Sequence, residues 1–210
     1  MSLTLVQVIE KAGSQEMAYV EDAPIHYIVL NRKDNTFDSD RIDALNALLD
    51  QVEATEGPGV LVTLGSGPRH FSTGFDLPFW AAKRDNIKSS VDRFNLLMAR
   101  IMTFPMPTMC VFTGTAFAGG YFLGLCHDYR VMHETRGLGI SLTELKLGIA
   151  LPDTFTQVLR AKLSPSVVTT ASFGSSITQV EALQQRMIDA TYANDEQAEK
   201  QVAAFAKRYA

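Results

Sequence analysis

The stretch PTMCVFTGTAFAGG (residues 107–120) runs from an apolar, strand-like segment into a turn rich in glycine. A second apolar segment, GVLVTLGSG (residues 59–67), is also strand-like and is also closed by glycines. A helical pattern lies between the two, and a strand, a helix and a second strand in this order imply parallel pairing through a crossover. We therefore expect an α/β fold built on a parallel sheet.

Hydrophobic periodicity assigns further elements on both sides of these two strands. Apolar side chains recur every three or four positions from Ile42 to Val52, which predicts a helix that begins at Asp38 or Ser39 and ends before Gly57. The other expected elements are a helix at about 89–102, strands at 3–11, 17–22, 25–31 and 128–134, and a mostly helical pattern from Pro152 onward.

Length and composition limit the classes of protein to consider. With 210 residues and 46% apolar content, the chain can build one sizeable core, so a single domain over residues 1–210 is expected. The formal net charge of −4 gives no field that would attract nucleic acid or an anionic membrane. A small-molecule substrate fits this charge balance better.

The sequence also gives expectations about cellular location and cysteine chemistry. No segment is long and apolar enough to span a membrane, and neither end carries a recognisable targeting signal. Cys110 and Cys126 both lie in apolar stretches, so neither a disulfide framework nor a cysteine metal site is expected. We expect a soluble protein of the reducing cytoplasm.

Two turns with glycine follow strands and open toward expected helices: FSTGFDL (residues 71–77) and GTAFAGGY (residues 114–121). Small residues let a ligand oxygen approach the backbone closely, and a helix start favours negative charge. Two free backbone N–H groups would form an oxyanion hole. The alternative is that the glycines only permit tight turns, and neither segment matches a phosphate-binding pattern.

Glu144 lies in the apolar segment LTELKLGIALP (residues 142–152). Burial of a carboxyl group raises its pKa toward neutrality, which suits a general base that must take and return a proton. The alternative is an ordinary exposed glutamate paired with the nearby Lys146. The residues of this segment, taken alone, favour the ordinary exposed glutamate.

Taken together, these segments resemble the crotonase (enoyl-CoA hydratase/isomerase) superfamily over about residues 28–189. Within it, the chain is most similar to the short 3,2-enoyl-CoA isomerases of the plant type. The matches, in family order, are LNR (30–32), FSTGFDL (71–77), PTMCVFTGTAFAGG (107–120), CHDYRVM (126–132) and TELKLGIALP (143–152).

The resemblance implies a crotonase-like spiral of repeated ββα units with a helical C-terminal part. The spiral core would span about residues 1–160, and a helical segment at about 161–210, shortened relative to the family, would serve trimer contacts and cover the site. A homotrimer, or a hexamer made of two trimers, is implied by analogy. An acyl-CoA thioester is the implied substrate, with coenzyme A as part of that substrate and no metal or other cofactor.

The resemblance also implies roles for individual residues. Glu144 matches the position of the catalytic base, and the backbone N–H groups of Phe75 and Gly119 match the two oxyanion donors. Substrate contacts are implied for Thr73, Gly74, Asp76, Leu77, Gly120, Phe122 and Leu151.

The resemblance favours isomerisation over hydration. Hydratases of the family use two glutamates, and one of these positions is Phe122 here. An apolar ring cannot hold or deprotonate water, whereas one carboxylate suffices to move a proton between two carbons. We expect Glu144 to carry a proton from C2 to C4 of a 3-enoyl-CoA. Hydration, thioester hydrolysis and a non-catalytic acyl-CoA-binding subunit remain alternatives, and the acyl chain length stays open.

For several other residues we expect a role in stabilising the fold and not in catalysis. His127 and Asp128 close an apolar segment and are expected to satisfy local backbone groups. Asp153 follows Pro152 at an expected helix start, where capping is the commoner role, although a second catalytic carboxylate is an alternative. Trp80 is expected in the core, although it could border an acyl tunnel.

Overall fold

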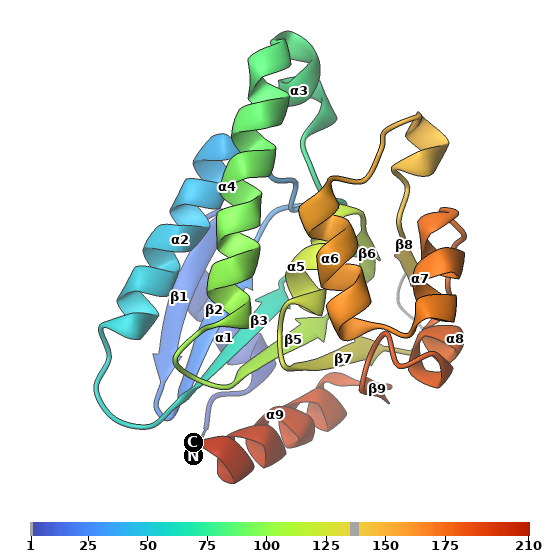
Figure 1. The fold of residues 1–210 in the computed structure, drawn as a ribbon. Helices are drawn as coiled ribbons and strands as arrows, with labels where there is room; N and C mark the ends of the chain where they lie inside the picture. The colour runs from blue at the N-terminus through green and yellow to red at the C-terminus, as the bar shows by residue number, and fades with distance from the viewer. Residues whose placement is uncertain (1, 135–138) are drawn as a thin grey trace.

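The computed structural model describes residues 2–134 and 139–210, which form two sheets surrounded by helices (Figure 1). The larger sheet has the strand order β1-β2-β3-β5-β7-β9 and the smaller one β4-β6-β8. The strands are β1 (Met17–Asp22), β2 (Ile25–Leu30), β3 (Val60–Gly65), β4 (His70–Ser72), β5 (Thr108–Phe112), β6 (Thr115–Phe117), β7 (Tyr129–His133), β8 (Ile140–Ser141) and β9 (Ala190–Tyr192).

The helices lie around these sheets and include the segments that border the candidate site. They are α1 (Leu5–Ala12), α2 (Ser39–Glu53), α3 (Leu77–Ala82), α4 (Arg84–Met102), α5 (Gly119–Leu125), α6 (Asp153–Lys162), α7 (Pro165–Ser172), α8 (Gln179–Gln184) and α9 (Asp195–Tyr209), with a 3₁₀ turn, η1 (Leu145–Leu147).

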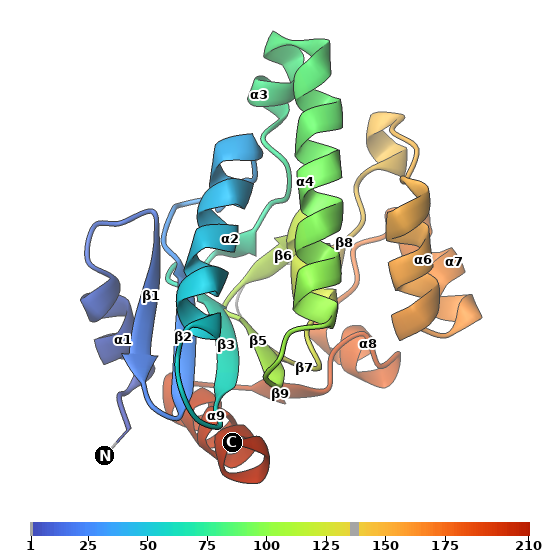
Figure 2. The same cartoon turned by 60° about the vertical axis from the view of Figure 1, so that its left-hand side comes forward.

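The parallel sheet expected from the sequence is confirmed. β1 pairs antiparallel with β2, and β2, β3, β5, β7 and β9 then pair in parallel. Every residue of β2, β3 and β5 is buried, as in a parallel sheet that is covered on both faces. One apolar cluster joins the sheet to α2 and α4, and the other joins its opposite face to α1 and α9 (Figure 2).

The repeated ββα pattern is visible in the order of the elements. β3 is followed by β4, β5 by β6 and β7 by β8, so each of these strands of the large sheet leads into a strand of the small one. A helical segment follows each pair: α3 with α4, then α5, then η1 with α6. The small sheet thus brings three strand-to-helix connections to one side of the molecule.

The expectation of a strand at residues 3–11 is wrong, because this segment forms helix α1. Thr4 and Gln7 form a capping box in which each side chain accepts from the other's backbone N–H. Leu5, Val8 and Ala12 then share one buried face at helical spacing. Further apolar residues, such as the exposed Val6, lie outside this buried face, and together with it they produced the alternating pattern that suggested a strand.

The C-terminal region is helical, as expected, but it also contributes a strand that the sequence pattern did not indicate. β9 pairs with β7 at the edge of the large sheet, and Asp189 just before it accepts from the backbone N–H of Arg130 at 2.8 Å. The Arg130 guanidinium forms an ion pair with the same carboxylate at 2.8 Å. Residues from 161 onward are therefore tied to the central sheet.

Gly120 in α5 packs directly against β4. A Cβ atom at this position would lie 2.5 Å from the Ser72 carbonyl oxygen and 2.7 Å from the Ser72 Cβ. These neighbours include backbone that cannot move independently, so α5 can approach the small sheet this closely only with glycine here.

We predict that Gly120→Ala lowers the free energy of unfolding by about 1–3 kcal/mol, the usual range for overpacking a core. Gly67→Ala is the matched control, because its Cβ would meet only the His70 carbonyl oxygen at 3.9 Å. Urea unfolding followed by circular dichroism measures both variants. Equal stability of the two would contradict the close approach of α5 to β4.

Candidate active site

A cavity of about 390 Å³ lies between α3 and α4 on one side and the segment from Thr143 to Phe155 on the other. Its wall is mostly apolar, with side chains from α3, α4, η1 and α6. The polar side chains on it are those of Thr36, Thr73, Thr143 and Glu144. Glu144 is therefore the one titratable group on the wall in the described part of the chain.

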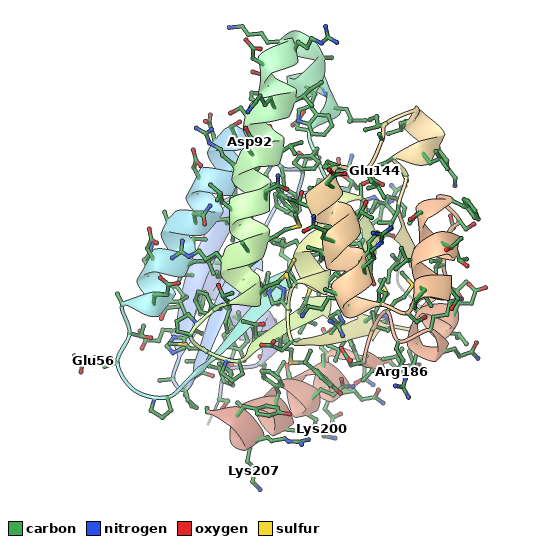
Figure 3. The ribbon with its side chains drawn as sticks, in the orientation of Figure 1. Glu56, Asp92, Glu144, Arg186, Lys200 and Lys207 are labelled. Carbon is green, nitrogen blue, oxygen red and sulfur yellow. The ribbon has the colours of Figure 1, made fainter. Side chains whose placement is uncertain are left out.

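Glu144 lies on the segment that leads from β8 into η1, and Figure 3 places it between the upper part of α4 and the start of α6. Its side chain is half-buried, and its Oε2 atom has no hydrogen-bond partner among residues 2–134 and 139–210. This burial raises the pKa of Glu144 above its ordinary value. An ion pair with Lys146 is absent, so the exposed-glutamate interpretation is wrong.

The two glycine-bearing turns meet beside this cavity. A Cβ at Gly74 would lie 3.0 Å from both the Ala118 Cβ and the Gly119 nitrogen. A Cβ at Gly119 would contact the Phe75 ring at 3.4 Å. Gly74 also has φ +89, which favours glycine. The turns are thus in contact, and the backbone N–H groups of Phe75 and Gly119 belong to adjoining segments.

Neither of these two N–H groups has an acceptor among the described residues. Gly119 is the first residue of α5, where backbone donors have no partner within the helix. The Phe75 N–H lies between two anchored neighbours, since Phe37 donates to the Gly74 carbonyl at 2.8 Å and accepts from the Asp76 N–H at 2.9 Å. The site therefore combines two free donors with one half-buried carboxylate.

Aromatic rings form the deep side of the cavity. Phe75, Trp80 and Phe155 lie on the wall. Phe155 is backed by Phe122 in an edge-to-face contact at 4.5 Å and by Phe94 at 5.8 Å between ring centroids. Such a surface excludes water and suits an apolar ligand.

The structure brings together part of the predicted site. Thr73, Phe75, Leu77 and Glu144 all lie on the cavity wall, as expected from the sequence. Gly74 and Gly119 form the junction of the two turns just described. Trp80 borders the cavity, so its placement purely in the core is wrong.

Five residues predicted to contact substrate are not on the cavity wall, and one of them is Gly74, at the junction of the two turns. Asp76 caps α3 by accepting from the Phe79 N–H at 2.9 Å. Gly120 packs against β4, and Phe122 is fully buried behind Phe155. Leu151 is partly buried against the main apolar cluster.

The structural interpretation of His127 and Asp128 is confirmed. The fully buried His127 ring lies 2.9 Å from both the Leu123 carbonyl oxygen and the Thr63 Oγ1, and burial lowers its pKa to about 4. Asp128 accepts from the backbone N–H and hydroxyl of Thr108. Asp153 is exposed at the start of α6 and does not line the cavity.

Sequence reasoning missed several wall residues. Thr143 and Ala118 each adjoin a predicted residue, so their sequence positions could have indicated them. Thr36, Val91 and Phe155 come from segments with only core or turn patterns, and only the tertiary fold brings them to the cavity.

Within residues 2–134 and 139–210, every helix is too short or too polar to cross a bilayer.

Comparison with known proteins agrees with this geometry. Enoyl-CoA delta isomerase 2, peroxisomal, of Arabidopsis thaliana is 33% identical over 141 residues, covering 63% of this chain and 58% of the relative. A probable enoyl-CoA hydratase of Bacillus subtilis is 35% identical over 117 residues, covering 55% of this chain and 44% of the relative. The chain thus spans less than two thirds of the length of these relatives.

Solved structures give the same result for the fold. A Mycobacterium tuberculosis protein described as a probable enoyl-CoA hydratase has a TM-score of 0.85 and 25% identity, covering 93% of this chain and 82% of that one. A second structure of that protein, described as an enoyl-CoA isomerase, has a TM-score of 0.81 and 25% identity, with coverage of 93% and 84%. The model of the enoyl-CoA hydratase/isomerase family matches residues 21–209. The chain therefore belongs to the enoyl-CoA hydratase/isomerase family.

Proposed function

We propose that this chain moves the double bond of an enoyl-CoA from C3 to C2, with Glu144 as the single proton carrier. The observation that carries the proposal is the composition of the cavity wall, on which Glu144 is the one titratable group described. The naming of the Arabidopsis relatives as enoyl-CoA delta isomerases supports the same reaction. Other relatives are named as hydratases, so the choice of isomerisation depends mainly on the finding that Glu144 is the one titratable group described on the cavity wall.

In the proposed reaction, the thioester oxygen accepts hydrogen bonds from the N–H groups of Phe75 and Gly119. The ionised Glu144 removes a proton from C2, and the electron pair left behind is delocalised over the thioester oxygen, C2 and C4 as a dienolate. Glu144, now protonated, returns the proton to C4. The double bond then lies between C2 and C3, and the thioester is intact.

The two donors would act where negative charge develops. One oxyanion donor contributes about 2.7–4 kcal/mol to catalysis in well-studied cases, and its effect increases in a site from which water is excluded. The junction of the turns at Gly74 and Gly119 supports this role, because neither N–H group has an acceptor in the described part of the chain.

Hydration would require a second group that holds and activates water. Asp153 is exposed and does not line the cavity, and the Phe122 ring is buried behind Phe155. Neither position supplies a second carboxylate on the cavity wall beside Glu144. The chemistry proposed here uses only backbone donors and one carboxylate, so it requires no metal or redox cofactor.

Assembly and location also remain proposals. Phe173 at the end of α7 and Val180 on α8 are each 64% exposed, and contacts between subunits would cover such side chains. This supports the proposed trimer or hexamer. The cytoplasmic location stays a prediction, since two of the Arabidopsis relatives are named as peroxisomal.

The proposal predicts that Glu144→Gln lowers the isomerisation of trans-3-hexenoyl-CoA by about 10²–10⁴-fold, because the variant loses its general base. The assay follows the 2-enoyl thioester by ultraviolet absorbance. Glu181→Gln, a change at an exposed carboxylate on α8, is the control and should keep full activity. Wild-type hydration of crotonyl-CoA without isomerisation would instead support a hydratase.

The raised pKa of Glu144 predicts opposite effects of pH on activity and stability. Activity requires the ionised base, so kcat/KM should decline as pH falls through the raised pKa. A pKa above the unfolded value favours the protonated folded state, so stability from this group is present below the unfolded pKa and is lost as pH rises through the folded pKa.

Glu144→Gln should therefore gain stability over the wild type at about pH 8 and gain none at about pH 4. Thermal unfolding at several pH values measures this difference. A variant that is less stable than the wild type at both pH values would show that the carboxylate has a stabilising partner.

A further inference from the structure

We infer that Arg41 is a positioning residue, whose guanidinium fixes the turn that carries the Phe75 N–H and the start of helix α3. The inference rests on the proposed function, because it explains how one oxyanion donor keeps its place. Arg41 lies in the first turn of α2 and is not on the cavity wall. It acts through Thr36 and Asp76.

One guanidinium nitrogen of Arg41 connects separate segments of the site. Arg41 Nη1 donates to Thr36 Oγ1 at 2.8 Å and to the Thr36 carbonyl at 3.2 Å. The same nitrogen lies 3.2 Å from Asp76 Oδ2 and 3.1 Å from Asp38 Oδ2. The Thr36 hydroxyl in turn donates to Asp76 Oδ2 at 3.3 Å. Helix α2, the wall residue Thr36 and the turn are thereby joined.

Asp76 transmits this restraint in two directions. Its other oxygen accepts from the Phe79 N–H and caps α3, from which Leu77 and Trp80 reach the cavity wall. Its backbone N–H donates to Phe37, next to Thr36 in the chain. Phe75 lies directly before Asp76 in the chain, so we expect a shift of Asp76 to reach, through this one residue, the peptide that carries the Phe75 N–H.

Burial and charge make this contact different from ordinary surface pairs. The side chains of Arg41 and Asp76 are 17% and 22% exposed. Burial alone would raise the pKa of Asp76, but the Phe79 N–H and the Arg41 guanidinium outweigh it, and the pKa is lowered. Removing Arg41 would leave the partly buried Asp76 carboxylate with the Phe79 N–H and the Thr36 hydroxyl as donors but without this cation, and we expect the turn to shift toward water.

The test compares Arg41→Gln, Asp76→Asn and the double variant with the wild type. Arg93→Gln is the matched control, because Arg93 pairs with Asp43 on the exposed face of α2 and α4, at side-chain exposures of 43% and 55%. The readouts are kcat and KM for trans-3-hexenoyl-CoA, the thermal midpoint, and the infrared carbonyl stretch of bound hexanoyl-CoA. This saturated thioester reports the strength of the oxyanion hydrogen bonds without reacting.

Arg41→Gln should lower kcat by about tenfold with little change in KM, since displacement of a positioned group by 1 Å can cost about 10²-fold in rate. The bound carbonyl should move to a higher frequency, because it is less polarised. The double variant should be no slower than the slower single variant, since both changes break one connection. Arg41→Lys should recover part of kcat, and Arg93→Gln should match the wild type.

An unchanged kcat and carbonyl frequency in Arg41→Gln, with only a lower thermal midpoint, would overturn the inference and leave Arg41 a purely structural role. Additive losses in the double variant would overturn it as well. A wild-type protein that binds hexanoyl-CoA but isomerises nothing would refute the proposed function, while the carbonyl shift would still test Arg41. Failure of the wild type to bind hexanoyl-CoA would overturn both.

Discussion

Gly74 and Gly119 lie so close together that a side chain on Gly74 would press against the start of α5. A Cβ atom on Gly74 would lie only 3.0 Å from the backbone nitrogen of Gly119. This contact joins the connection after β4 to the start of α5, and the small sheet holds both in place. At this junction lie two backbone donors that have no acceptor within residues 2–134 and 139–210. The oxyanion role proposed for Phe75 and Gly119 depends on this junction, and Glu144 lies on the wall of the same cavity as Phe75.

Whereas the glycine junction is a steric constraint, Glu144 introduces an electrostatic one. A half-buried carboxylate beside an apolar wall, with no partner for its Oε2 atom among the described residues, is unfavourable for folding, and its raised pKa expresses this cost. The same property suits a group that must accept and return one proton near neutral pH. The buried network around His127 and Arg130 differs, because its side chains bond to backbone carbonyls and to Asp189. At Glu144 the unfavourable burial of a carboxylate coincides with the proposed chemistry.

Much of the fold could be predicted from the sequence because its parallel strands are continuous apolar runs closed by glycine. The helix α1 was missed because six apolar residues between Leu3 and Ala12 fit a period of two as well as one of 3.6, and only the Thr4–Gln7 capping box separates them. Glu144 and the two turns were found from residue type and order. Phe155 and Arg41 were not, because their importance arises from neighbours that lie far away in the chain. Asp76 was assigned to substrate for a similar reason: its motif position was visible, but its partner Arg41 was not.

The transfer of a labelled proton tests the central claim, a single carboxylate that serves both carbons, most directly. Trans-3-hexenoyl-CoA with deuterium at C2 would be converted in ordinary water, quenched within the first turnover, and analysed by mass spectrometry and NMR. If Glu144 carries the proton in a cavity with mostly apolar walls, part of the product should hold deuterium at C4. Product with only solvent hydrogen at C4 would contradict this account and would indicate a separate acid that exchanges with water.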